Sequence, residues 1–360
     1  MKSQRLKLTA FMLAAVIFSG CSQNVSSAEK DRISAEPESV SIFAMDTYMT
    51  ITVYDGDKSS ALSAAQQRVQ SLEKLWSVTD EDSEVYRINH SGGEAVDVSA
   101  ETAELIDFAL DMCEQTGGAL DITLYPVLCE WGFTAGEYQV PSEERIKELL
   151  EKTGRDKVKL EGKAVTVSEG TRIDLGAVGK GETGDRIISE LKANGVSSAL
   201  LDLGGNIQLL GSKPDGSDWK IGLKSPFDTS DNIAKLELSD CCVITSGGYE
   251  RYFTDDDGNI YWHILDPKTG FPAKSGIISA TVIGKSGRLC DALSTSLFVM
   301  GEDRAKDLWQ SRDDFEFVLI TDDDRLIMTE GLEGRLTLFE GYSDMKTETV
   351  KKGECHTKVF

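Results

Sequence analysis

The sequence is poor in positive charge, in long hydrophobic runs and in paired cysteines. Only 38 Lys and Arg residues stand against 61 Asp and Glu residues, so the formal net charge at pH 7 is −23. This charge excludes nucleic acid as the expected partner, because phosphate backbones are bound by surfaces rich in Lys and Arg. It still permits a small anionic ligand that is held by backbone N–H groups and a metal ion. None of the seven cysteines forms a C-x-x-C pair, so a zinc site is not expected.

An apolar run covers residues 8–18 and follows three basic residues. It is too short to cross a bilayer core of about 30 Å as a helix, so it predicts a signal peptide over residues 1–21. Small residues lie directly before Cys21, as in the processing site of bacterial lipoproteins. We therefore expect Cys21 to carry a lipid that holds the exported chain on a membrane. The alternative is an ordinary secretory signal with a cysteine at that place by coincidence.

The rest of the chain predicts one domain between two polar ends. Residues 22–40 are rich in Ser, Ala and Glu and have little apolar content, which is typical of a flexible tether. No internal repeat and no break rich in Pro, Gly or Ser divides residues 41–345. We predict a single domain there, with a division into two lobes left open, and a polar tail over residues 346–360.

Helical and strand patterns are mixed along this domain. Apolar periodicity and capping residues predict the helices, and β-branched or alternating segments predict the strands. The expected helices cover residues 61–76, 100–115, the stretch from Pro141-Ser142 to near Gly154, 185–193 and 291–300; the expected strands and hairpins cover residues 41–54, 158–167 and 173–175, with a hairpin turn at 255–259. Because regular βαβ alternation is lacking, the pattern predicts an α+β fold of mixed sheets with flanking helices.

Residues 174–181 are the first candidate site. Three glycines here lie between the predicted strand end and the helix at residues 185–193. Free N–H groups at a helix N-terminus bind phosphate, and Lys180 adds a positive charge. The spacing does not match that of a P-loop. Taken alone, the segment favours a simpler interpretation, which is a glycine turn with a surface lysine.

Asp291 and Thr295 form the second candidate, a metal site. On a helix, residues four positions apart share a face, so both oxygen-bearing side chains point to one place. A small set of hard oxygen ligands suits Mg²⁺, which takes its other ligands from water and substrate phosphates. The alternative is that Asp291 only caps its helix, and without further context this alternative is favoured.

The third candidate is a histidine, of which the sequence has only three. His90 lies in a polar loop and His356 lies in a charged tail. If the chain uses a histidine as general base, His263 is the candidate among the three. A structural or merely exposed histidine is the alternative.

Taken together and in this order, these segments resemble the ApbE family, the FAD:protein FMN transferases. The resemblance rests on seven collinear motifs within about residues 41–340. They are Ala44-Met45-Asp46-Thr47-Tyr48; Leu120-Asp121-Ile122-Thr123 with Pro126 and Trp131-Gly132-Phe133; Ile173-Asp174-Leu175-Gly176-Ala177-Val178-Gly179-Lys180-Gly181; Asp202-Leu203-Gly204-Gly205-Asn206-Ile207; Thr245-Ser246-Gly247; His263-Ile264-Leu265-Asp266-Pro267-Lys268-Thr269-Gly270; and Asp291-Ala292-Leu293-Ser294-Thr295. The lipoprotein start is also similar to that of the family.

The resemblance implies a role for each candidate. The metal ligands would be the carbonyl of Ala177 and the side chains of Asp291 and Thr295, and His263 would be catalytic. The implied FAD site consists of Met45, Asp121, Asp174, Lys180 and Leu265, with Ala119, Leu120, Ser246 and Gly247 near it. The sequence departs from the family at Asp46, where many members have Gly, at Gly248, where an acidic residue is frequent, and at Ser294, where some members have an Asp ligand.

The implied activity is Mg²⁺-dependent transfer of FMN from FAD to a Thr or Ser hydroxyl of an acceptor protein, with release of AMP. The alternatives are an FAD pyrophosphatase that gives FMN and AMP, and a flavin-binding lipoprotein without enzymatic activity. The expected partners are FAD, an exported redox protein with a flavinylation motif, and a membrane reached through the lipid anchor. The expected location is the outer face of the bacterial cell membrane or a membrane that faces the periplasm.

Overall fold

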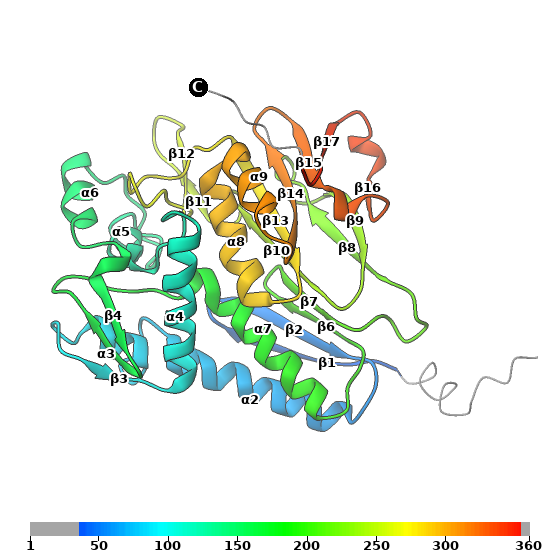
Figure 1. Cartoon of the computed structure of the whole chain (residues 1–360), viewed down its shortest axis with the longest axis horizontal. Coiled ribbons are helices and arrows are strands. Elements are labelled where there is room, and N and C mark those ends of the chain that lie inside the picture. The colour runs from blue at the N-terminus through cyan, green and yellow to red at the C-terminus, as the bar shows by residue number, and fades with distance from the viewer. Residues whose placement is uncertain (1–35, 354–360) are drawn as a thin grey trace, which may run out of the picture. The chain divides into compact units, whose positions relative to one another are not determined.

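A computed structural model of the chain describes residues 36–353 (Figure 1). The predicted signal peptide with Cys21, most of the predicted tether, and His356 lie outside these residues. The described residues belong to one compact unit of the chain. No helix within residues 36–353 is long and apolar enough to cross a membrane.

A nine-stranded sheet forms the centre of this unit. The strand order is β1-β2-β6-β7-β10-β13-β14-β15-β17, and all neighbours are antiparallel except β15 and β17. The bounds are β1 Glu38–Ala44, β2 Thr47–Val53, β6 Ala199–Leu203, β7 Asn206–Leu210, β10 Cys242–Gly247, β13 Ile277–Gly284, β14 Phe315–Thr321, β15 Arg325–Thr329 and β17 Lys346–Val350.

Helices cover one face of the sheet, and a second sheet covers part of the other (Figure 1). The helices are α2 (Lys58–Trp76), α7 (Gly176–Ala193), α8 (Gly287–Met300) and α9 (Glu302–Gln310). Apolar side chains of α2 and α7 pack on β1, β2 and β6, whereas those of α8 pack on β10 and β13. The second sheet consists of β8 (Trp219–Lys224), β9 (Asn232–Leu238) and β16 (Leu336–Leu338). This mixture of sheets and flanking helices confirms the predicted α+β class.

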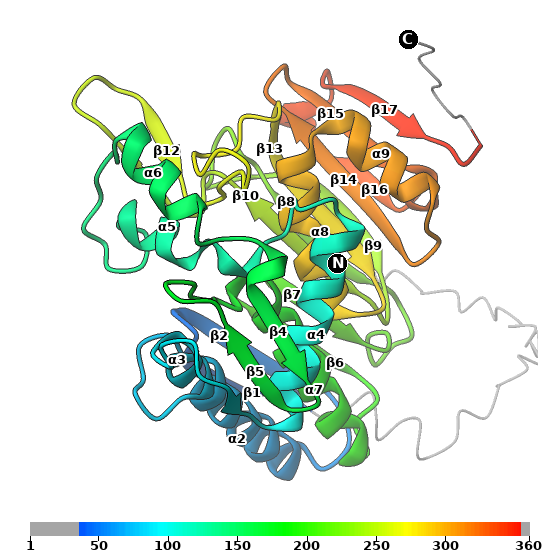
Figure 2. The same ribbon diagram turned by 60° about the vertical axis from the view of Figure 1, so that its left-hand side comes forward.

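Smaller elements complete the helical side of the unit. A three-stranded sheet of β3 (Val96–Asp97), β5 (Ala164–Val167) and β4 (Val158–Glu161) lies near α3 (Glu84–Asn89) and α4 (Ala100–Gln115). Helices α5 (Tyr125–Glu130) and α6 (Glu143–Leu150) and the hairpin of β11 (Tyr252–Thr254) and β12 (Ile260–Trp262) enclose Trp131 in an apolar cluster of their own (Figure 2). Short 3₁₀ turns cover Ile122–Leu124, Arg155–Lys157, Glu330–Leu332 and Glu340–Tyr342.

The first predicted strand is in fact a tight hairpin. Residues 41–54 were expected as one strand, but β1 and β2 are joined by Met45 and Asp46, with φ angles of 50° and 57°. A two-residue hairpin turn of type I′ needs positive φ at both positions, which usually selects Asn-Gly. The N–H of Met45 donates to Oε1 of Glu73 on α2 over 2.8 Å, which holds this turn against the helix.

The glycine-rich segment is helical, and the predicted turn is wrong. Residues 173–175 do not form a strand, and α7 begins at Gly176 rather than at residue 185. Glycines in a helix normally weaken it, which is why the sequence favoured a turn. Two of them lie against a neighbouring segment: a Cβ on Gly181 would lie 2.2 Å from the carbonyl oxygen of Gly287, and a Cβ on Gly184 would lie 2.1 Å from Nε2 of the buried Gln208 on β7.

Helix α8 begins four residues earlier than predicted. Its N-cap is Ser286, and the main-chain N–H groups of Gly287 and Arg288 donate to the carboxylate of Asp185 over 2.7 and 3.1 Å. Asp291 therefore lies inside the helix, and the interpretation of Asp291 as the N-cap is wrong.

Other boundaries agree or differ slightly. The structure confirms α4 at residues 100–115 and the hairpins at 158–167 and around 255–259. Helix α6 ends four residues before the predicted end. The predicted polar tail is wrong at its start, because residues 346–350 form β17, which pairs in parallel with β15 at the edge of the central sheet.

Candidate active site

Helices α7 and α8 touch through glycine. A Cβ on Gly181 would lie 2.2 Å from the carbonyl oxygen of Gly287 and 2.7 Å from Cβ of Asp291, so only glycine permits this approach. The main-chain N–H of Gly181 donates to Oδ2 of the buried Asp291 over 2.8 Å. The structure thus brings together two stretches, 174–181 and 291–295, that the sequence resemblance assigned to one site.

The same hydrogen bond bears on the carbonyl of Ala177. In a regular α-helix the N–H of Gly181 would donate to this carbonyl, which lies four residues earlier. The N–H of Gly181 also donates to Asp291, and a carbonyl oxygen can accept two hydrogen bonds, so the Ala177 carbonyl has acceptor capacity for another partner. This capacity agrees with the metal-ligand role that the resemblance implied for Ala177.

Hydroxyl groups from β10 and α8 meet one turn further along α8. The Ser246 hydroxyl lies 2.8 Å from that of Ser294 and 3.2 Å from Oγ1 of Thr295. Ser294 also donates to the carbonyl of Asp291 over 2.9 Å and is fully buried. Ser294 therefore anchors α8 to β10, and Asp291 is left as the acidic side chain of this stretch.

The surroundings of Asp291 suit a cation. Burial raises the pKa of Asp291, and the charge of Lys180 and the N–H of Gly181 oppose this rise. The buried amide of Asn206 also opposes the rise in the pKa of Asp291. Neither of the two polar atoms of this amide has a hydrogen-bond partner at normal distance among the described residues. A bound ion or an ordered water can satisfy an amide that has no other partner and lies next to a buried carboxylate.

No three His, Cys, Asp or Glu side chains within residues 36–353 are grouped closely enough to bind a metal. The candidate ligand set of Ala177, Asp291 and Thr295 has one carbonyl, one carboxylate and one hydroxyl, so it does not need such a group. Mg²⁺ is commonly held by one or two carboxylates together with water and substrate phosphates. The residues present therefore fit Mg²⁺.

A second part of the site is assembled by main-chain contacts. The side chain of Asn89 forms two hydrogen bonds with the main chain of Ile173, of 2.8 and 2.7 Å. The N–H of Asp174 donates to the carbonyl of Ile122 over 2.8 Å. The segment that carries Asp121 and the segment that carries Asp174 consequently lie side by side, and the second of them leads directly into α7 at Gly176.

The two acidic residues of this part are held in different ways. Asp121 accepts hydrogen bonds from the N–H and the hydroxyl of Thr123 at 2.8 and 2.5 Å, and Asp174 accepts from the N–H of Gly176 at 2.7 Å. Burial raises the pKa of both carboxyl groups. The side chains of Ala119 and Leu120 are buried in the core, so only their main chain is available to a ligand.

His263 is fixed by the main chain of Arg251. The main-chain nitrogen of His263 and its ring atom Nδ1 both lie 3.1 Å from the carbonyl oxygen of Arg251. Because a carbonyl only accepts, Nδ1 carries the proton and Nε2 keeps its lone pair. Burial, together with the positive charges of Arg251 and Lys180, lowers the pKa of His263 to about 4. The imidazole is therefore neutral at pH 7 and able to take up a proton at Nε2.

The remaining predicted residues flank these parts. Met45 packs against α7, where the hydroxyl of Thr183 lies 3.6 Å from its sulfur. Gly247 ends β10, next to Ser246. Leu265 is buried beside Trp131, whose indole N–H donates to the carbonyl of Gly270 over 2.8 Å and fixes the loop that follows His263.

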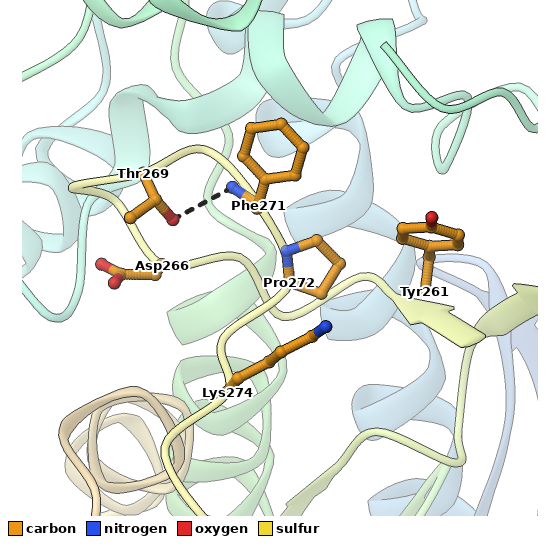
Figure 3. A pocket seen from close by; sticks show the side chains of 6 residues that line it. All are labelled: Tyr261, Asp266, Thr269, Phe271, Pro272 and Lys274. Carbon is orange, nitrogen blue, oxygen red and sulfur yellow. Dashed lines mark hydrogen bonds between the residues drawn. The ribbon is translucent and has the colours of Figure 1, made fainter. Parts of the chain in front are cut away.

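A surface pocket of about 490 Å³ lies on this same loop (Figure 3). It is lined by Tyr261, Asp266, Thr269, Phe271, Pro272 and Lys274. None of the predicted site residues lines it, although His263 and Leu265 lie in the same stretch of chain. It is thus a neighbour of the candidate active site.

Two contributors to the site were missed in the sequence. Asn89 positions the segment before Asp174, and Arg251 orients His263. Asn89 and Ile173 are 84 positions apart, and no local pattern predicts their contact. Arg251 is one of 38 basic residues, and only the pairing of β11 with β12 places it opposite His263.

A histidine that is neutral at pH 7 and lies within electrostatic reach of Arg251 and Lys180 is a candidate catalytic group for an anionic substrate. Residues 45–319 match the ApbE family. The chain is 31% identical to the FAD:protein FMN transferase of Treponema pallidum over 316 residues, or 82% of this chain and 87% of the relative. A relative of the same name from Klebsiella pneumoniae is 32% identical over 296 residues, with 81% of this chain and 91% of the relative covered.

Solved structures agree with these relatives. The ApbE protein of Thermotoga maritima matches with a TM-score of 0.78 and 33% identity, covering 83% of this chain and 99% of the other. The flavin transferase ApbE from Vibrio cholerae matches with a TM-score of 0.75 and 27% identity over the same shares. The chain belongs to the ApbE family.

Proposed function

We propose that this chain transfers FMN from FAD to a Thr or Ser hydroxyl of an acceptor protein, with release of AMP and a requirement for Mg²⁺. Flavin transfer is the activity named for its ApbE relatives, which are enzymes that use FAD and a protein. The single observation that supports the finer proposal best is the contact of α7 with α8, where the N–H of Gly181 meets the carboxylate of Asp291.

The Ala177 carbonyl, the Asp291 carboxylate and the Thr295 hydroxyl would hold Mg²⁺. When bound, the ion supplies positive charge against the negative charge that develops on the diphosphate during displacement at phosphorus. Asp291 is kept in place by Gly181, and Thr295 is kept near β10 by the hydroxyl of Ser246.

His263 acts on the acceptor hydroxyl. The hydroxyl oxygen attacks the phosphorus of the FMN half, its proton passes to Nε2 of His263, and the bond from that phosphorus to the bridging oxygen breaks, so that AMP leaves. General base catalysis of this kind contributes roughly 10²–10⁴-fold to the rate. The hydrogen bond from Nδ1 to the carbonyl of Arg251 keeps the ring in the tautomer that this step requires.

The location of the enzyme is also a proposal. A lipid on Cys21, followed by the predicted tether, would keep the catalytic unit near the outer face of a membrane. The tether was predicted to end at residue 40, but its last three residues belong to β1, which begins at Glu38. An acceptor at the same membrane would then meet the site at high effective concentration.

The test uses the purified chain with FAD, Mg²⁺ and an acceptor protein. We expect a flavin adduct that remains on the acceptor after denaturation, and one AMP per adduct in mass spectrometry. Free FMN and AMP without an adduct would identify a pyrophosphatase, and unchanged FAD with stable binding would identify a flavin-binding protein; either outcome refutes the proposal.

Asp291→Asn tests the metal-ligand role. The asparagine oxygen still accepts the hydrogen bond of Gly181, so the α7–α8 contact survives while the charge is lost. We expect loss of most Mg²⁺-dependent transfer, whereas Asp107→Ala, which changes an exposed carboxylate on α4, should leave transfer unchanged. Full transfer with an unaltered Mg²⁺ requirement in Asp291→Asn would refute the ligand role.

A further inference from the structure

Two positive side chains at the site form no salt bridge among the described residues, although both lie within electrostatic reach of Asp174. Within the described part of the chain, neither Lys180 nor Arg251 forms an ion pair, and the guanidinium of Arg251 has only a long hydrogen bond of 3.4 Å to the carbonyl of Phe133. The chain carries 61 acidic residues, and most of its other arginines do form ion pairs. Two cations without a salt bridge leave positive charge available to an anion from outside the chain.

Both cations act on the same groups. Burial lowers the pKa of His263, and the charges of Arg251 and Lys180 lower it further. The same two charges oppose the rise that burial causes in the pKa of Asp174. Arg251 and Lys180 therefore lie within electrostatic reach of His263 from two different elements, the start of β11 and helix α7.

The main chain and the side chain of Arg251 have separate tasks. Its carbonyl accepts both hydrogen bonds from His263, so the main chain at this position cannot move without moving the imidazole. Its side chain is exposed, and a planar guanidinium presents paired N–H groups that match two phosphate oxygens. One residue therefore sets both the position of the His263 imidazole, through its carbonyl, and the position of a guanidinium that can bind a phosphate.

We propose that Arg251 is a second phosphate-binding cation of the active site, acting with Lys180 on the diphosphate of the substrate, and that its carbonyl positions His263 for proton uptake. This inference rests on the proposed function for the identity of the diphosphate. Arg251 stabilises the phosphate oxygens as negative charge builds up on them during the displacement. The same residue thereby aligns the phosphorus with the hydroxyl that His263 deprotonates.

The experiment compares Arg251→Gln and Arg251→Lys with Arg335→Gln, a matched change of an exposed arginine far along the chain in the loop before β16. Binding of FAD and of riboflavin, which has no phosphate, is measured by flavin fluorescence. Loss of one charge-assisted contact should weaken FAD binding by roughly tenfold to a hundredfold in Arg251→Gln. Riboflavin binding should not change, and Arg335→Gln should match the unaltered chain in both.

Three kinetic readouts separate phosphate binding from a merely structural role. In Arg251→Gln, kcat for transfer should fall, Arg251→Lys should recover part of it, and added guanidinium should raise it again. The acid limb of the pH–rate profile should move to higher pH, because one of the two cations facing His263 is gone while Lys180 remains. Equal FAD binding in Arg251→Gln and the unaltered chain, or equal weakening of FAD and riboflavin binding, would overturn the proposal. Failure of the unaltered chain to flavinylate any acceptor would count against the proposed function instead, since the binding comparison does not depend on transfer.

Discussion

Replacing Gly181 with alanine tests the contact on which the site is built. The new Cβ would lie 2.2 Å from the carbonyl oxygen and 2.5 Å from the carbonyl carbon of Gly287, and 2.7 Å from Cβ of Asp291. All three atoms belong to the main chain or lie next to it, so no flexible side chain can move aside. Overpacking of this kind costs about 1–3 kcal/mol, and it has to be relieved by separating α7 from α8.

The control is Gly179→Ala, two positions earlier on the same helix. Its Cβ would lie 3.8 Å from the nearest atom, in the ring of Trp76, which is an ordinary contact. Alanine is a better helix former than glycine by roughly 0.5–1 kcal/mol, so this variant should be as stable as the unaltered chain or more stable. Both substitutions replace a glycine of α7 with alanine, but Gly181→Ala is expected to lower the free energy of unfolding and Gly179→Ala is expected to keep or raise it.

Denaturant unfolding measures the change in stability, and titration of the transfer reaction with Mg²⁺ measures the change in the Mg²⁺ requirement. We expect Gly181→Ala to have a lower free energy of unfolding than Gly179→Ala and to need more Mg²⁺ for half-maximal transfer, because Asp291 and the Ala177 carbonyl move apart. If Gly181→Ala is as stable as Gly179→Ala and keeps the same Mg²⁺ dependence, the close contact does not organise the site.

Two other predictions concern His263 and Asn89. The pKa of His263 is lowered from 6.5 to about 4 in the folded chain, so the unfolded chain binds more protons between these values. Stability should therefore fall as the pH drops from 6.5 to 4, and the acid limb of the transfer rate should lie well below pH 6.5. A limb at 6.5 would contradict the lowered pKa of this imidazole. Asn89→Ala removes two hydrogen bonds to buried Ile173 and should lower both the free energy of unfolding, by roughly 1–3 kcal/mol, and the affinity for FAD. Asn89→Asp keeps an acceptor for the N–H of Ile173 and should lose less stability. Equal stability of both variants and the unaltered chain in denaturant unfolding would exclude this anchoring role.

Local signals were sufficient for part of the fold. Helix α4 was predicted at its observed bounds, because Ser99 caps it and apolar residues recur with helical period until Gly117. The hairpin at 158–167 and the hairpin turn at 255–259 were predicted from turn residues, and the structure has paired strands on either side of both turns. In each case the sequence pattern and the structure depend on residues close together in the chain.

The site depends on contacts that sequence spacing does not reveal. Glycines of α7 were interpreted as a turn, because the reason for Gly181 is the neighbouring Gly287, more than a hundred positions away. Asp291 was favoured as an N-cap, because the capping role of Ser286 was not recognised. The individual ligand residues came from the resemblance to the ApbE family, while Arg251 and Asn89 emerged only from the folded arrangement.

The metal site is tested most directly by a crystal of the chain grown with FAD and Mn²⁺, with the ion located by its anomalous scattering. We predict one strong peak within ligand distance of the Ala177 carbonyl, the Asp291 carboxylate and the Thr295 hydroxyl, in contact with the phosphates of FAD. A flavin bound elsewhere, or an ion held without Asp291, would contradict this prediction.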